Sequence, residues 1–378
     1  MNKLKQRSVK SVVKSLGRLS SLWLKKDYSY RKKAVQRLTI QSGYSEAMAQ
    51  ALLDSLFTEL TEKKLWQLLK VELGDPLTLD GFRKDPLTKK FVRAQGPKRI
   101  FHIFAGNVPN PAILSFIFGM IVKSVNVGKV SSKDPGFLDI YLDSLRSVDP
   151  LLARTNTLVR SKKLIQESMK SSGLVVAYGS EESLAQIQKD LLPGKVFFGY
   201  GHRMSFGFYT REALSKKGAA GLAVRTARDI WMMDQRGCLS PLVIYVEKGG
   251  GVSPIRFAEL VAKELKKLGP WAVYFAESGK NSRQIVALPA LAAHRSITVR
   301  AFGSLAQVYR AFSPVQKYLQ AVALETSAGR SRQIAEGLAR LGVNRICRAG
   351  KMQSPPLTWH HDGRFNLASW VTWTDLEI

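Results

Sequence analysis

The chain has 378 residues, of which 45% are hydrophobic and 9% aromatic, so it predicts two or three folded lobes and excludes a mainly disordered protein. Its two cysteines are too few for a disulfide framework or a cysteine-rich zinc site, which indicates a reducing, cytoplasmic compartment. The formal net charge of +29 favours phosphate-bearing or acidic partners.

No apolar run reaches the roughly 20 residues that a membrane-spanning helix needs. The N-terminus also lacks a continuous apolar stretch before a small-residue cleavage site, so we expect no secretory signal. Both observations favour a cytoplasmic protein.

Basic side chains are concentrated at the start of the chain. Residues 1–37 carry twelve of them against a single acidic residue, Asp27, and their apolar residues recur at helical spacing. This pattern predicts a basic amphipathic extension over residues 1–40. We expect it to be solvated or weakly docked, with contact to an anionic membrane surface through residues 1–37 as the alternative.

Residues 41–95 are predicted to form a helical lobe. Apolar residues recur at helical spacing between residues 45 and 73, and Thr61 followed by Glu62 predicts the start of the second of two helices. Gly and Pro residues from position 74 onward end this helical pattern.

Beyond residue 96 short β-rich runs alternate with helical runs, which is the pattern of βαβ units and a parallel sheet. Residues 96–210 are therefore predicted to form a doubly wound, Rossmann-type nucleotide-binding domain. A helical run over residues 213–233 then leads into a strand over residues 242–246, which begins a second α/β domain over residues 211–345.

Cys238 lies between this helix and this strand, in the run of residues 233–241 (MDQRGCLSP). A cysteine acts as a nucleophile only as the thiolate, which needs partial exposure and nearby positive charge or backbone N–H groups, and Arg236 and the loop can supply these. A lone cysteine is more often a small buried hydrophobic residue. We assign that structural role to Cys347, which lies in a strand-like run.

A turn at residues 105–109 (AGNVP) follows a predicted strand and precedes a predicted helix. Open α/β sheets bind ligands at the carboxyl ends of their strands, so Asn107 is a candidate donor to a developing oxyanion. The run is also ordinary turn chemistry, which is the structural alternative.

A second run after a predicted strand, residues 129–135 (KVSSKDP), offers donors for a phosphate or a ribose. The donors are the ammonium groups of Lys129 and Lys133 and the hydroxyl of Ser131, with a further hydroxyl from Ser132.

A third run, residues 177–180 (AYGS), places Gly179 and Ser180 directly before a predicted helix. Glu181 and Glu182 in the first turn of that helix stabilise the helix more than they favour an anionic ligand. None of these runs is a Gly-x-Gly-x-x-Gly fingerprint, and each is a weak signal by itself.

Together and in this order, the runs resemble the aldehyde dehydrogenase superfamily, and more closely its LuxC-like acyl-CoA reductase branch. The resemblance covers most of the chain after about residue 40. The runs that carry it are residues 106–109 (GNVP), 129–135, 177–180, 234–241 (DQRGCLSP) and 359–363 (WHHDG).

The resemblance implies an α/β fold with a Rossmann-type cofactor domain at residues 96–210 and a catalytic cysteine domain at residues 211–345. It further implies that residues 346–378 return to the cofactor and oligomerisation region, and that the protein is a homo-oligomer.

The resemblance also implies the roles of the site residues. Cys238 is the nucleophile, and Asn107 with the backbone N–H of Cys238 forms the oxyanion site. Lys129 reaches the adenosine ribose or its phosphate, and Gly179 and Ser180 lie beside the cofactor pyrophosphate.

The implied reaction is the reduction of a fatty acyl-CoA or acyl-carrier thioester to the fatty aldehyde, through an acyl group bound to Cys238. We expect NADPH as the cofactor, because Lys129 and Lys133 can contact a 2′-phosphate. Acyl carrier protein and an acyl-protein synthetase are the implied protein partners.

Two runs depart from the wider superfamily. Residues 198–205 (FGYGHRMS) hold no acidic residue where hydrolytic aldehyde dehydrogenases have Glu-Leu-Gly-Gly, so water activation is absent and the acyl group is left for hydride or thiol. Residues 300–303 (RAFG) correspond to the Glu-x-Phe-Gly that holds the nicotinamide ribose, and Arg300 puts that contact in doubt.

His202 is a candidate acid or a residue that orients the thiol, although a hydrogen-bonded loop histidine is the commoner role. The chain has five histidines, and no two of them have metal-ligand spacing with a third ligand, so we expect no metal.

Two other classes of function remain open at this point. An acyltransferase or acyl-binding protein that has lost hydride transfer would explain Arg300. A nucleic-acid or membrane-surface binding protein would explain the charge, but the sequence shows no helix-turn-helix, zinc-finger or RNP-type motif, so we expect no specific nucleic acid.

Overall fold

The computed structural model describes residues 3–106, 108–132, 134–277 and 295–377, and it divides into two compact units. The first unit holds residues 1–201 and 356–378, and the second holds residues 202–355. The boundary at residues 201 and 202 lies nine residues before the predicted one, and the C-terminal segment returns to the first unit at residue 356 rather than 346.

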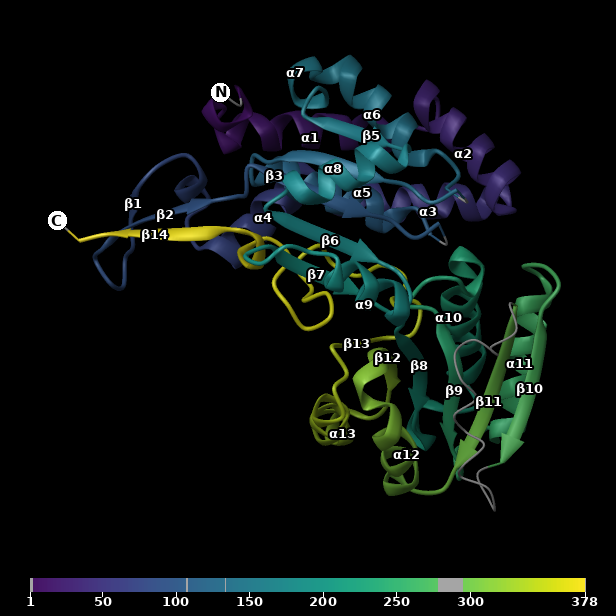
Figure 1. Cartoon of the computed structure of the whole chain (residues 1–378). Helices are drawn as coiled ribbons and strands as arrows, with labels where there is room; N and C mark the ends of the chain where they lie inside the picture. The colour runs from purple at the N-terminus through teal and green to yellow at the C-terminus, as the bar shows by residue number, and fades with distance from the viewer. Residues whose placement is uncertain (1–2, 107, 133, 278–294, 378) are drawn as a thin grey trace. The chain divides into compact units, whose positions relative to one another are not determined.

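The first unit contains a five-stranded sheet and a small three-stranded sheet (Figure 1). Its helices are α1 (Val9–Trp23), α2 (Ser29–Ser42), α3 (Glu46–Glu59), α4 (Glu62–Leu73), α5 (Asn110–Ile121), α6 (Phe137–Val148), α7 (Pro150–Ala153), α8 (Lys162–Ser171) and α9 (Glu181–Lys189). Its strands are β1 (Arg83–Lys84), β2 (Phe91–Gln95), β3 (Arg99–Ile103), β4 (Val125–Lys129), β5 (Asn156–Val159), β6 (Leu174–Tyr178), β7 (Val196–Tyr200) and β14 (Thr372–Leu376).

The five-stranded sheet is parallel throughout, with the order β5-β4-β3-β6-β7. Helices α8 and α9 cover one face, where Ile165 and Ile187 pack against Phe101 and Val175. Helix α5 covers the other face. This is the doubly wound arrangement that the alternating β and α runs predict.

Helix α1 is part of the core of the first unit. Val12, Val13 and Leu16 are at most 1% exposed, and Trp23 stacks on Phe57 at a ring-centroid distance of 4.7 Å. The helix packs closely on α4, because a Cβ atom on Gly17 would lie 2.5 Å from the Cβ of Glu62.

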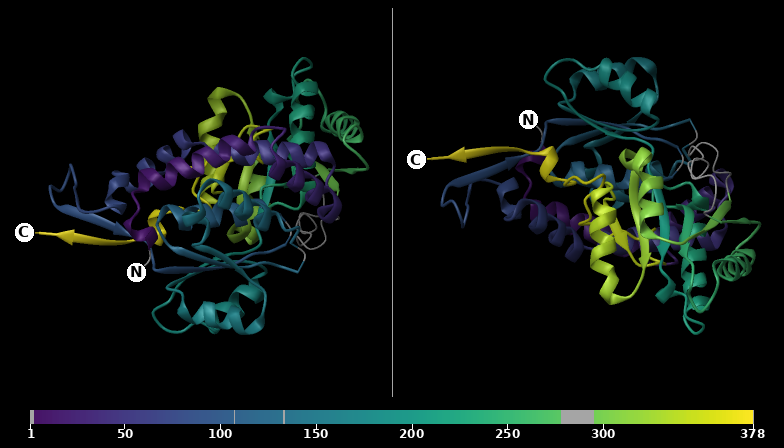
Figure 2. Two further views of the ribbon diagram at one scale, coloured as in Figure 1. Left: turned by 90° about the horizontal axis from the view of Figure 1, so that it is seen from above. Right: turned by 90° about the horizontal axis from the view of Figure 1, so that it is seen from below.

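The expectation of a solvated or weakly docked extension over residues 1–40 is therefore wrong. The apolar face of α1 is buried by protein, so it is not available to a membrane surface, and only its basic face meets solvent. Figure 2 shows α1 and its neighbouring N-terminal helices lying together on the first unit.

The three-stranded sheet pairs the C-terminal strand β14 with β2, which precedes the five-stranded sheet in the chain. Strand β14 pairs with β2 in antiparallel register, from Thr372 opposite Gln95 to Leu376 opposite Phe91, and β1 pairs with the other side of β2. The aromatic side chains of Trp373 and Phe91 are each 41% exposed.

The second unit is built on a six-stranded parallel sheet with the order β10-β11-β9-β8-β12-β13. Its elements are β8 (Met204–Tyr209), α10 (Ala219–Trp231), β9 (Pro241–Glu247), α11 (Pro254–Lys266), β10 (Ala272–Glu277), β11 (Ser296–Phe302), α12 (Leu305–Phe312), β12 (Leu319–Glu325), α13 (Ala328–Arg340) and β13 (Arg345–Cys347). Helices α12 and α13 pack on one face through Phe312 and Leu338, against Phe206 and Phe302 of the sheet. Among the described residues, no helix is long and apolar enough to span a membrane.

A buried histidine links β3 to α5 and β4. His102 is fully buried, and its two ring nitrogens lie 2.8 Å from Ser115 Oγ and 3.0 Å from Asn126 Oδ1. Burial lowers the pKa of His102 to about 3, so the ring is neutral in the folded protein. A neutral ring completes its hydrogen bonds inside the sheet without burying a charge.

This burial predicts a dependence of stability on pH. In the unfolded chain His102 takes up a proton below about pH 6.5, whereas the folded ring stays neutral down to about pH 3. The free energy of unfolding therefore falls as the pH falls through this window, by on the order of 2 kcal/mol between pH 7 and pH 5 from this residue alone.

Urea unfolding at pH 7 and pH 5 tests this with the variant His102→Gln. The variant is expected to be less stable than the wild type at pH 7 and to lose less stability on going to pH 5. An equal loss in both proteins would contradict the assignment.

Candidate active site

Cys238 lies three residues before β9, at the amino edge of the six-stranded sheet. Its side chain is partly buried, and its carbonyl oxygen accepts a hydrogen bond from Ser205 Oγ at 2.7 Å. Ser205 is at the start of the neighbouring strand β8, and its hydroxyl oxygen also accepts from the backbone N–H of Ala321 on β12. Ser205 thus links the backbone of the cysteine to β8 and, through Ala321, to β12.

The turn before Cys238 has an unusual backbone. Met233, Asp234 and Gln235 have φ values of 53°, 56° and 61°, so three consecutive residues with side chains adopt the left-handed conformation. Each such residue costs about 1 kcal/mol or more. Such a turn persists only where surrounding contacts hold it.

The carboxylate of Asp234 is one such contact. Its side chain is 3% exposed and accepts two hydrogen bonds from Arg295, from Nε at 2.8 Å and from Nη2 at 3.2 Å. Arg236 Nη2 donates to the same carboxylate at 3.4 Å. The sequence suggested Arg236 as the positive charge beside the thiolate. In the structure its guanidinium also pairs with the buried carboxylate of Asp234.

The side-chain amide of Gln235 is the second contact. Its Nε2 donates to the carbonyl oxygens of Ser296 at 2.7 Å and Pro241 at 3.0 Å, and its Oε1 accepts from the N–H of Ser296 at 3.1 Å. The amide thus pairs with the first residue of β11 as a neighbouring strand would. Sequence reasoning missed Asp234, Gln235 and Arg295 as supports, although the first two lie within the recognised cysteine run.

A segment after β13 supports the loop from the other side. Gln353 Nε2 donates to Ser240 Oγ at 3.0 Å, and the backbone N–H groups of Gly350 and Met352 donate to Asp229 of α10 at 2.6 and 3.0 Å. Burial raises the pKa of Asp229 to about 7. No sequence signal connected residues 350–353 to the cysteine loop.

The run Arg300 to Gly303 lies elsewhere in the second unit. Strands β9 and β11 are parallel, with Thr298 opposite Val243 and Phe302 opposite Glu247. Cys238 precedes the first residue of β9, whereas Gly303 follows the last residue of β11, so the two lie at opposite edges of one sheet. The run therefore does not lie beside Cys238, and its correspondence to a ribose contact stays a prediction that this register does not support.

Residues 198–205 carry the chain from the first unit to the second. Residues up to Tyr200 belong to β7 and residues from Met204 to β8, and none of the run is acidic. The His202 imidazole is exposed, and the carbonyl of this residue accepts from Arg203 Nη1 at 3.2 Å. A catalytic role for His202 stays a prediction.

The predicted cofactor residues belong to the first unit. Lys129 ends β4, and together with Ser131 it lines a cavity of about 580 Å³. Gly179 and Ser180 follow β6, which lies on the other side of β3, and they are not in the lining of this cavity. Asn107 and Lys133 lie outside the described residues.

Ser180 is the N-cap of α9. Its Oγ accepts the backbone N–H of Ser183 at 3.3 Å, and Glu181 and Glu182 occupy the first turn. The hydroxyl is thus used by the helix itself.

The C-terminal run at residues 359–363 packs against β7. The His361 ring lies between the rings of Tyr200 and Trp359, at centroid distances of 4.5 and 5.0 Å. Four nearby hydrogen bonds from Asn366, Leu367 and Ala368 converge on the buried carboxylate of Glu72. These contacts fix the returning chain on the first unit.

Among residues 3–106, 108–132, 134–277 and 295–377, no group of three His, Cys, Asp or Glu side chains is placed to hold a metal ion.

Comparisons with known proteins identify the family of the chain and its fold. The family model described as acyl-CoA reductase (LuxC) matches residues 4–271 and 269–373. The long-chain acyl-protein thioester reductase of Photorhabdus laumondii is 27% identical over 252 residues, which cover 65% of this chain and 51% of that protein. The Vibrio harveyi protein of the same name is 25% identical over 246 residues, covering 63% and 50%. The chain spans about half the length of the curated relatives it matches.

Solved structures give the fold. An oxidoreductase from Marinobacter aquaeolei superposes with a TM-score of 0.74 at 12% identity, covering 99% of this chain and 88% of that one. Betaine aldehyde dehydrogenase from Staphylococcus aureus superposes with a TM-score of 0.72 at 11% identity, covering 99% and 83%. The predicted aldehyde dehydrogenase-like α/β fold is confirmed.

The two cysteines are expected to differ in reactivity. Burial raises the pKa of Cys347 to about 11, so only about one Cys347 side chain in a thousand is a thiolate at pH 8. Iodoacetamide at pH 8 should therefore modify Cys238 first, as read from the masses of the two cysteine peptides. Equal or faster labelling of Cys347 would contradict the assignment of the nucleophile.

Gln235 is expected to act as a positioning residue. The variant Gln235→Ala loses three hydrogen bonds and should lower the rate of Cys238 acylation by about tenfold or more, with little change in KM. The matched control is Gln307→Ala, which removes two hydrogen bonds to the backbone N–H groups of Gly303 and Ser304 at the opposite edge of the sheet. Equal losses in both variants would show a general loss of stability instead.

Proposed function

The chain belongs to the acyl-CoA reductase (LuxC) family, and we propose that it reduces a long-chain acyl thioester to the aldehyde through an acyl group bound to Cys238. The observation that carries this proposal is the partly buried cysteine, held at the amino edge of the sheet by a left-handed turn. A turn that costs free energy and leads directly to a cysteine is typical of a functional site.

In the first half-reaction the Cys238 thiolate attacks the carbonyl carbon of the thioester, so a new carbon–sulfur bond forms and the bond to the carrier sulfur breaks. The carrier leaves as a thiol after taking a proton. The backbone N–H of Cys238 and the side chain of Asn107 are the proposed donors to the oxyanion.

In the second half-reaction the acyl group leaves Cys238 as an aldehyde. NADPH, when bound, supplies the hydride for this step. The released cysteine sulfur is a thiolate again, ready for the next acyl group. His202, the first residue of the second unit, is the proposed acid or thiol-orienting residue.

The residues 198–205, where the chain passes from the first unit to the second, favour reduction over hydrolysis. No residue in the run 198–205 is acidic, so this run offers no carboxylate to activate water. An acyl group on Cys238 then survives until hydride or thiol reaches it.

The first unit fits a nicotinamide dinucleotide. The cavity of about 580 Å³ at the end of β4 is large enough for an adenosine, and Lys129 and Ser131 give it donors for a ribose or phosphate. Gly179 and Ser180 are proposed to lie beside the pyrophosphate. The S. aureus betaine aldehyde dehydrogenase was solved in complex with NAD+, which supports a nicotinamide cofactor here.

The substrate is proposed to be a fatty acyl group on a protein or on CoA. The P. laumondii and V. harveyi relatives are named acyl-protein thioester reductases, and a chain with a net charge of +29 attracts both an acidic carrier protein and the phosphates of CoA. An acyl-protein synthetase is a further proposed partner. The free cysteines fit the reducing cytoplasm.

We also propose a homo-oligomer. Strand β14 is the last strand of its sheet and pairs with β2 on one side, so its other edge offers backbone groups to a second chain. The acyltransferase alternative is less favoured, because Arg300 lies toward the carboxyl end of β11, opposite Tyr245 of β9, and away from Cys238.

The acyl intermediate gives the direct test. Incubation of the full chain with a long-chain acyl-CoA, without NADPH, should add one acyl mass to the Cys238 peptide, and addition of NADPH should release the aldehyde. The variant Cys238→Ala should show neither, whereas the matched variant Cys347→Ala should keep both. An acyl adduct that still forms in Cys238→Ala would contradict the proposal.

A further inference from the structure

The cavity at the end of β4 is partly formed by a helix that the sequence placed in a basic extension. Its lining comes from the ends of β4 and β5, from the loop between β4 and α6, and from Arg37 and Gln41 of α2. Helix α2 therefore contributes to the same cavity as Lys129, which lies 92 positions after Arg37 in the chain.

Arg37 is held toward the loop that follows β4. With the Gln41 amide oriented to satisfy its neighbours, Gln41 Oε1 accepts from Arg37 Nη1 at 3.1 Å and its Nε2 donates to the carbonyl of Pro135 at 2.9 Å. A Cβ atom on Gly136, whose φ is 73°, would lie 3.7 Å from Arg37 Nη1. The guanidinium is thus positioned by one hydrogen bond, which leaves most of its donors for another group.

The charges around the cavity do not cancel. Asp139 is occupied by Arg160, whose Nη2 donates to both carboxylate oxygens at 3.1 and 3.0 Å. Asp134 accepts the backbone N–H of Gly136 at 2.7 Å, and burial raises its pKa. Arg37 and Lys129 form no ion pair with a carboxylate of the described residues, and the described lining carries three cationic against two acidic side chains.

We propose that Arg37 recognises a phosphate on the 2′-oxygen of an adenosine ribose in this cavity, together with Lys129, and so determines preference for NADPH over NADH. The inference rests on the proposed function, and it assigns to an arginine of α2 a share of the selectivity that the sequence analysis expected from Lys129 and Lys133. A guanidinium matches a phosphate with paired N–H donors. In doubly wound domains an acidic side chain favours a free 2′-hydroxyl, whereas an arginine accommodates the 2′-phosphate.

The test measures binding and does not depend on catalysis. Isothermal titration of the full chain with adenosine 2′,5′-bisphosphate, adenosine 3′,5′-bisphosphate and 5′-AMP separates the 2′-phosphate of NADPH from the 3′-phosphate of CoA. The wild type should bind the 2′,5′ compound about tenfold or more tightly than the other two. The variant Arg37→Gln should lose this preference and bind 5′-AMP as the wild type does, and Arg37→Lys should keep part of it.

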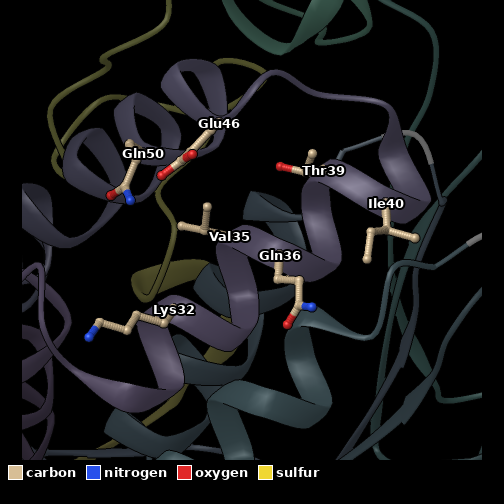
Figure 3. Close-up of a pocket in the computed structure, with 7 residues that line it drawn as sticks. All are labelled: Lys32, Val35, Gln36, Thr39, Ile40, Glu46 and Gln50. Carbon is tan, nitrogen blue, oxygen red and sulfur yellow. The ribbon is translucent and has the colours of Figure 1, made fainter.

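Lys32 provides the matched control. It lies on the same helix but lines a different groove, with Val35 and Glu46 (Figure 3), so Lys32→Gln removes one positive charge of α2 without touching the cavity. We expect Lys32→Gln to keep the preference for the 2′,5′ compound. A loss in Lys32→Gln equal to that in Arg37→Gln would show a long-range effect of charge and overturn the inference.

Two further outcomes distinguish this inference from the proposed function. A wild type that forms aldehyde, yet binds the 2′,5′ compound no better than 5′-AMP or prefers the 3′,5′ compound, overturns the role of Arg37 and leaves the reductase proposal standing. A wild type that shows the Arg37-dependent preference, yet forms neither an acyl adduct nor aldehyde, supports the phosphate site and overturns the reductase proposal.

Discussion

The left-handed turn of residues 233–235 determines where Cys238 lies, because its backbone is costly and contacts from distant residues must hold it. Arg295 and Ser296, 61 positions further along the chain, supply those contacts through Asp234 and Gln235. The start of β11 therefore positions the loop that carries Cys238, three residues before β9. A cysteine held in this way suits the proposed reaction, in which the acyl group and the hydride arrive in separate steps.

All strands of the six-stranded sheet are parallel, so its amino edge and its carboxyl edge carry different residues. The amino edge carries Cys238, and the carboxyl edge carries an ion-pair network in which Arg330 contacts Glu212 at 2.9 Å and Glu247 at 2.7 Å. Arg300 belongs to a strand that runs toward this second edge. Cys238 and this ion-pair network are thus separated by the length of the strands.

The first unit uses its basic N-terminal segment in two ways. The apolar face of α1 fills the core around Trp23, while α2 brings Arg37 to the cavity at the end of β4. Part of the positive charge concentrated in residues 1–37 therefore belongs to the proposed cofactor site. The high net charge of the chain is in this respect a local feature of a binding site as well as a property of the whole surface.

The sequence by itself determined the parallel α/β architecture and the place of Cys238 between a helix and a strand, because both depend on local periodicity and on residues close together in the chain. It did not show that α1 is buried, since an amphipathic helix has the same pattern whether its apolar face meets protein or a membrane. Only the tertiary structure paired Asp234 with Arg295 and brought Arg37 beside Lys129. The first pair is joined by hydrogen bonds across 61 positions of the chain, and the second pair lines one cavity from 92 positions apart. Both depend on strand order and helix packing, which no local pattern encodes.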